Sequence, residues 1–70
     1  GTIMKVTVLV SDKRTAFGTS NREFWSYLSA YKYVKLHLDT ALAVVIKFES
    51  GTIKRTIPEF ISFMEIEEMP

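Results

Sequence analysis

Apolar and polar side chains alternate at the start of the chain, as in a half-buried β-strand. Residues 3–10 are rich in β-branched side chains, and the residues of one face are Met4, Val6, Val8 and Val10. The opposite face is half apolar, which favours a position inside a sheet rather than at its edge. We therefore predict an interior strand over residues 3–10.

A helix is predicted after a polar segment. Residues 11–20 show no sustained period and are typical of a surface loop. The segment Ser20-Asn21-Arg22-Glu23 matches a capping box, in which the serine and glutamate side chains bond to free amides of the first helical turn. The apolar residues that follow at helical spacing are Phe24, Leu28 and Tyr31, with Tyr27 alongside. These features predict one helix at about residues 21–33.

Three strands are predicted after this helix. The first has apolar residues at alternate positions, namely Val34, Leu36 and Leu38. The second covers residues 42–49 and has its apolar face at Val44, Ile46 and Phe48. Ser50-Gly51 indicates a hairpin, because glycine adopts the positive φ that tight turns require. Residues 52–57 should then return antiparallel to the second strand, with Ile53 and Ile57 inward.

The C-terminal segment supports two interpretations. As a helix, it would begin with a capping box of Thr56 and Glu59 and would bury Ile57, Phe60, Ile61 and Met64. As a strand over residues 60–67, it would place Phe60, Met64 and Ile66 on one face, and we prefer the strand because the composition is β-rich. The predicted fold is one compact α+β domain over residues 1–70, with a mostly antiparallel sheet of about five strands, in the order β-α-β-β-β-β, packed against a single helix.

The composition predicts a globular protein without an enzymatic site. Apolar residues make up 47% of the chain and charged residues 24%, which is outside the range of disordered segments. A single histidine, His37, and no cysteine leave neither a catalytic dyad nor a metal site, and the isolated glycines cannot form a phosphate-binding loop. We expect no metal, no cofactor and no catalytic residues. Without a long apolar run, we also expect a cytoplasmic protein that does not enter a membrane.

Charge is unevenly distributed along the chain. The net charge is +1, but residues 1–55 carry +5, and the last fifteen residues carry −4 at Glu59, Glu65, Glu67 and Glu68. One interpretation is an acidic tail or edge strand beside a basic body. The other is that the basic body faces an anionic partner, or that the acidic and basic ends of neighbouring copies meet.

Aromatic side chains suggest a contact surface on the helix. Adjacent helical residues point about 100° apart, so a buried Phe24 leaves Trp25 at the rim or outside. The candidate residues for binding a partner are Trp25, Tyr27 and Tyr33, because tryptophan and tyrosine are enriched in binding hot spots. They could equally cover the margin of the core. We expect a small interaction module, of the regulator, inhibitor or adaptor type, that binds a protein or a second copy of itself as a homodimer or larger homo-oligomer.

Nucleic acid is the alternative partner. The candidate basic residues are Lys13, Arg14, Lys35, Lys47, Lys54 and Arg55. Lys47 and Lys54 alternate with apolar neighbours on their strands, so they should share the sheet face away from the helix. A basic sheet face can follow a phosphate backbone. Against this, the face lacks the interleaved aromatic residues that stack on bases, and the net charge is small.

Overall fold

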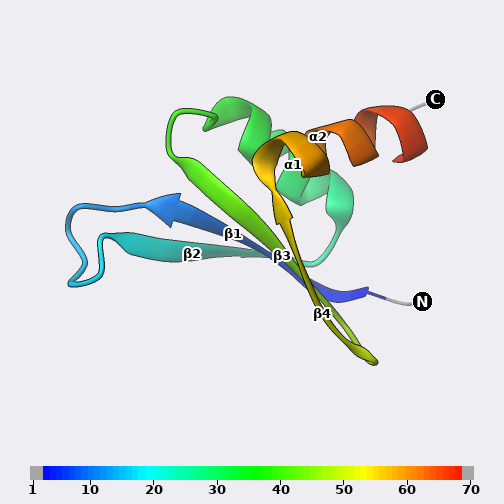
Figure 1. Cartoon of the computed structure of the whole chain (residues 1–70), viewed down its shortest axis with the longest axis horizontal. Helices are drawn as coiled ribbons and strands as arrows, with labels where there is room; N and C mark the ends of the chain where they lie inside the picture. Colours follow the sequence, from blue (N-terminus) through cyan, green and yellow to red (C-terminus); the bar gives the residue numbers. More distant parts are fainter. Residues whose placement is uncertain (1–2, 69–70) are drawn as a thin grey trace.

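The computed structural model describes residues 3–68, except for the side chains of Met4, Glu67 and Glu68. The expected inward position of Met4 and the acidic side chains of Glu67 and Glu68 therefore lie outside the described residues. The elements, in chain order, are β1 (Ile3–Ser11), β2 (Thr19–Phe24), α1 (Tyr27–Leu36), β3 (Ala41–Phe48), β4 (Gly51–Thr56), α2 (Ile57–Phe63) and the π-helical turn η1 (Met64–Glu68) (Figure 1).

The strands form one antiparallel sheet in the order β2-β1-β3-β4. Both helices cover the same face of this sheet, and the other face is left open (Figure 1). The α+β class and the antiparallel sheet are confirmed. The predicted order β-α-β-β-β-β is wrong, because the described residues form four strands and two α-helices in the order β-β-α-β-β-α.

The core lies between the sheet and the two helices. Its largest fully buried side chains are Val6, Val8, Val34, Val44, Phe60 and Met64. Val8 pairs with Val44 across the two central strands, and Val6 pairs with Ile46. The predicted inward faces of β1 and β3 are therefore confirmed. In a strand, every second side chain lies on the same side of the sheet, so these apolar residues all face the helices.

The helix predicted at about residues 21–33 begins later than expected. Residues 19–24 form strand β2, paired with β1 from Val6↔Phe24 to Ser11↔Thr19, so the capping box at Ser20 does not exist. Ser26 is the actual N-cap, and its side chain accepts the N–H of Ser29. Gly18, with φ at +75°, closes the β1–β2 connection in a conformation that other residues rarely adopt.

The strand predicted at residues 34–38 is also wrong. Helix α1 continues to Leu36, and His37 is its C-cap. Val34 is fully buried, whereas the side chain of Leu36 is 81% exposed. Val34 belongs to a helical stripe that includes Ala30 and Tyr31, four and three residues earlier, and this contact with the sheet outweighs the local alternation.

The β3–β4 hairpin is confirmed, but the segment after it is a helix. Gly51 has φ at +152° and begins β4, which ends at Thr56. Thr56 and Glu59 form both bonds of the capping box, so the helical interpretation of the C-terminal segment is correct and the preferred strand is wrong. Burial of Ile57, Phe60 and Met64 on one side of this segment explains the outcome.

Candidate functional site

The three aromatic residues predicted to bind a partner lie in three different surroundings. Trp25 is 75% exposed, in the connection between β2 and α1. Tyr27 is half-buried, with its ring centroid 5.3 Å from that of Phe63. Tyr33 lies between the ring of Phe24, at 5.3 Å, and that of His37, at 4.2 Å. The structure thus separates these residues, and their role in binding stays a prediction.

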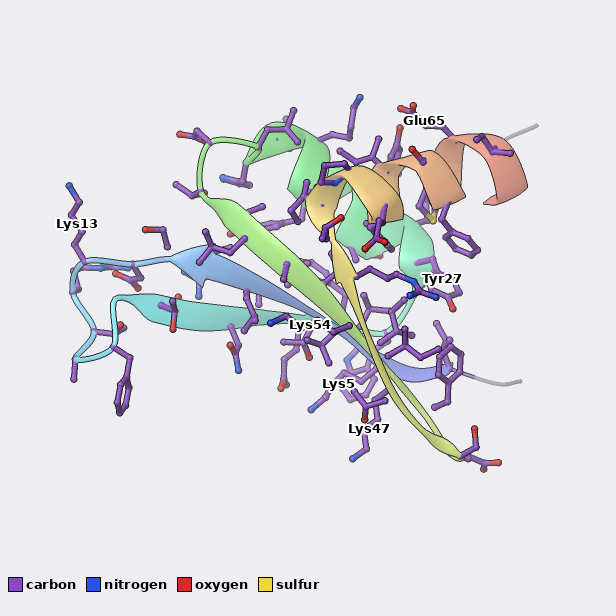
Figure 2. All side chains as sticks on the ribbon, viewed as in Figure 1. Lys5, Lys13, Tyr27, Lys47, Lys54 and Glu65 are labelled. Carbon is purple, nitrogen blue, oxygen red and sulfur yellow. The ribbon has the colours of Figure 1, made fainter. Side chains whose placement is uncertain are left out.

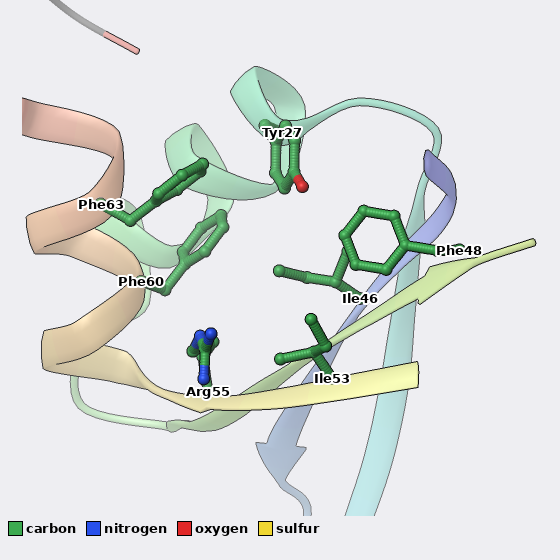
Figure 3. Close-up of a pocket in the computed structure, with 7 residues that line it drawn as sticks. All are labelled: Tyr27, Ile46, Phe48, Ile53, Arg55, Phe60 and Phe63. Atoms are coloured by element: carbon green, nitrogen blue, oxygen red, sulfur yellow. The ribbon is translucent and has the colours of Figure 1, made fainter. Parts of the chain in front are cut away.

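A pocket of about 220 Å³ lies between the helices and one end of the sheet. The side chains that line it come from α1, β3, β4 and α2 and are Tyr27, Ile46, Phe48, Ile53, Arg55, Phe60 and Phe63. Figure 3 shows these side chains pointing into a common space. The lining is apolar apart from the phenol of Tyr27 and the guanidinium of Arg55.

The register of the sheet and the short path into α2 build this pocket. Ile46 pairs with Ile53 and Val44 pairs with Arg55, so both β4 residues lie on the face that the helices cover. Because α2 begins directly after β4, its first turns pass back over the same strands and bring in Phe60 and Phe63. Ile46, Phe48 and Ile53 lie on the inner face, as strand alternation predicts. The pocket does not follow from the sequence prediction, because it requires Phe60 and Phe63 to lie in a helix and not in the preferred strand.

Strand β4 forms an exposed edge of the sheet beside the pocket. All six of its residues are exposed, and among the residues that the structure describes no strand pairs with its outer side. An edge strand leaves a row of N–H and C=O groups free to pair with another chain. Ile53 and Arg55 belong to both features, since they line the pocket and lie on the edge.

The electrostatic surroundings of Arg55 are open. Among the side chains that the structure describes, no carboxylate forms an ion pair with Arg55. The charge of Arg55 acts on Glu59, whose carboxylate accepts the N–H of Thr56 at 2.8 Å. This hydrogen bond is the main cause of the lowered pKa of Glu59. A hydrogen bond with the Thr56 side chain and, more weakly, the positive charge of Arg55 lower this pKa further. Glu59 is therefore ionised and held at the helix cap.

Three lysines share the open face of the sheet. Lys5 of β1 lies opposite Lys47 of β3, and Lys54 of β4 lies opposite Val45 in the adjacent row. Figure 2 shows Lys5 and Lys47 pointing away from the helices. Nζ of Lys5 is 2.9 Å from the carboxylate of Glu23, which partly neutralises this group.

The other predicted basic residues do not join this face. Lys35 lies on the last turn of α1, with Nζ 3.4 Å from the carboxylate of Glu65. Lys13 and Arg14 lie in the β1–β2 connection, where the hydrogen bond from the Arg14 side chain is the main reason that the pKa of Asp12 falls to about 2. The open face thus unites Lys47 and Lys54 of the predicted set. Lys5 also lies on this face but was not in the predicted set. It could have been found from the sequence, because Lys5 is adjacent to Val6 on the strand and must therefore lie on the opposite face.

The described part of the chain contains neither a metal site nor a membrane-spanning helix. Within it, no group of three or more His, Asp or Glu side chains could hold a metal ion. None of its helices is long and apolar enough to cross a membrane. Comparison with known families, curated proteins and solved structures finds no significant match to this chain.

Proposed function

We propose that the protein is a non-enzymatic binding module that captures an extended segment of a partner protein along β4. One apolar side chain of that segment enters the pocket beside the strand. The observation that carries the proposal is the position of Ile53 and Arg55, which belong at once to the pocket wall and to the exposed sheet edge.

An added strand would pair with the free N–H and C=O groups of β4. An added strand makes main-chain hydrogen bonds with an edge strand, and its alternate side chains give specificity through neighbouring pockets. Strands in a sheet lie about 4.8 Å apart, so a side chain of the incoming strand on the helix side stands directly next to Ile53. The pocket therefore receives one side chain from each bound segment.

The size of the pocket favours a side chain over a free small molecule. Its volume is about 220 Å³. Sites for drug-sized ligands hold roughly 300–1,000 Å³, whereas the burial of one Phe or Leu side chain contributes about 1.5–3 kcal/mol. A single anchor of this strength, with the hydrogen bonds of the edge, suits a weak, reversible interaction.

Titration of the isotopically labelled protein with a blocked peptide tests the proposal. The peptide Thr-Glu-Thr-Phe-Thr-Glu-Thr should shift amide resonances of β4 and of the pocket, and replacement of its Phe by Ala should weaken binding at least about tenfold. Ile53→Thr should weaken binding similarly. The matched control is Ile66→Thr, because Ile66 is 74% exposed on η1, away from the pocket lining. Shifts at other surfaces but not at β4 would refute strand addition.

Nucleic-acid binding is a second candidate function, supported by the grouping of Lys5, Lys47 and Lys54 on the open face. Three phosphate contacts with a single strand imply a slope of log affinity against log salt of about −2. Anisotropy of a labelled oligonucleotide at several salt concentrations measures this slope. Lys47→Gln should reduce its magnitude by about 0.7, whereas Lys13→Gln should not. Affinity independent of salt would exclude this candidate.

A further inference from the structure

Strand β4 is a cationic edge. Its sequence from Gly51 to Thr56 contains Lys54 and Arg55 and no acidic residue. The two cations are adjacent, so Lys54 lies on the open face and Arg55 lies on the face that the helices cover. A strand that pairs with β4 therefore meets one positive side chain on each of its faces.

Arg55 is the charged member of the pocket lining. Figure 3 shows its side chain next to Ile53 and Phe60, at the same space that the other lining residues face. A guanidinium binds carboxylates through paired, charge-assisted hydrogen bonds, which are stronger than neutral ones. A ligand with an apolar group alone would leave these donors unused.

Glu59, the described carboxylate on which the charge of Arg55 acts, does not take this role. Glu59 contributes to the electrostatic field at Arg55, but its oxygen is bonded to the N–H of Thr56 at the start of α2. Glu59 reduces the positive potential of the edge without forming an ion pair with Arg55. Among the described side chains, no carboxylate occupies the donors of the guanidinium, and they can bind a carboxylate that arrives from outside.

From this charge pattern, and resting on the proposed function, we infer that the segment bound at β4 is acidic. It carries an aspartate or glutamate two positions from its apolar anchor. Ile53 and Arg55 are themselves two residues apart on one face of β4, and residues two apart on the incoming strand share a face at a spacing of about 6.6 Å. The anchor thus enters the pocket beside Ile53 while the carboxylate reaches Arg55. In an antiparallel arrangement the acidic residue precedes the anchor.

Matched peptides and variants of the whole chain test the inference. The acidic peptide Thr-Glu-Thr-Phe-Thr-Glu-Thr is compared with Thr-Gln-Thr-Phe-Thr-Gln-Thr by titration of the labelled protein at low and high salt. We expect the acidic peptide to bind about tenfold more tightly at low salt, the gain typical of a hydrogen bond to a charged group, and this preference to shrink as salt rises.

Arg55→Gln should abolish the preference for the acidic peptide, so that the acidic and glutamine peptides bind this variant with equal affinity. Arg22→Gln is the matched control, because Arg22 lies opposite Val8 on the same face of the sheet, on the other edge strand β2. Both positions lie on edge strands, and unchanged unfolding midpoints confirm that each variant is folded.

The outcomes separate the two proposals. Equal binding of the two peptides at β4, unaffected by Arg55→Gln, would overturn the acidic partner and retain strand addition. A preference for the acidic peptide whose resonance shifts lie at Lys5 and Lys47 would also overturn it, since the attraction would then belong to the open face. If neither peptide shifts β4, the proposed function itself fails.

Discussion

The phenol of Tyr31 on α1 donates a hydrogen bond to the carboxylate of Glu65 on η1, with Oη and Oε2 2.8 Å apart. Lys35, one turn after Tyr31, approaches the same oxygen at 3.4 Å. The hydrogen bond from Tyr31 is the main cause of the lowered pKa of Glu65, and it raises the pKa of Tyr31 itself. This contact attaches the C-terminal turn to the first helix.

Tyr31→Phe should reduce stability in a pH-dependent way. Because the pKa of Glu65 is lowered, the ionised carboxylate stabilises the folded state at pH values above the ordinary pKa of 4.5. This stabilisation is lost as pH falls through the lowered pKa. Because the pKa of Tyr31 is raised, the protonated phenol stabilises the folded state at pH values below the ordinary pKa of 10.0. This stabilisation is lost as pH rises through the raised pKa. Urea unfolding should therefore show a deficit in the variant at neutral pH that shrinks in acid. Tyr33→Phe, which removes a hydroxyl elsewhere on α1, should give no such acid dependence.

Ser26→Ala should destabilise the protein by about 0.5–2 kcal/mol, because the Ser26 side chain caps α1 by accepting the N–H of Ser29. Ser20→Ala should cost less than about 0.5 kcal/mol, since Ser20 lies on strand β2 and caps no helix. Denaturant unfolding of the two variants measures the difference. A larger cost at Ser20 would contradict the position of the helix start.

Phe60→Ala should remove about 3–5 kcal/mol of stability, the usual cost of truncating a fully buried phenylalanine. Small domains have roughly 5–15 kcal/mol in total, so this variant should be close to unfolding at 37 °C. Thermal unfolding followed by circular dichroism tests the expectation. Ile66→Ala is the control, and its midpoint should stay near that of the unmodified chain because Ile66 is exposed.

Trp25→Ala should change the free energy of unfolding by less than about 0.5 kcal/mol in spite of the size of the side chain, because Trp25 is exposed. Trp25 is also the single tryptophan of the chain. Its fluorescence should already have the red-shifted maximum of a solvated indole in the folded state and should move little on unfolding. A blue-shifted maximum would show that something covers this side chain.

Local patterns predicted the elements that contact the core through a regular face. Val6 and Val8 repeat with a period of two and lie where the alternation placed them, and the same holds for Val44 and Ile46. Strand β2 has one apolar residue, Phe24, so its pairing with β1 leaves almost no trace in the sequence. The false capping box at Ser20 was the stronger local signal.

The candidate site could be predicted only in part. Ile46, Phe48 and Ile53 follow from strand alternation, and Tyr27 was selected for its aromatic ring. Their convergence depends on α2 turning back directly after Thr56, which is a tertiary feature. The basic face was predicted from Lys47 and Lys54, but Lys35 was misplaced with the strand that turned out to be the end of α1.

The central position of β1 determines how the chain must fold. The hairpin of β1 with β2 is local in the sequence. In contrast, the contact between Val8 and Val44 joins residues that are separated by more than thirty others. Closing such a long loop costs entropy before the contact contributes any free energy. We therefore expect the rate-limiting event to be the meeting of β1 with β3, and a nascent chain to complete its sheet only after both hairpins have been synthesised.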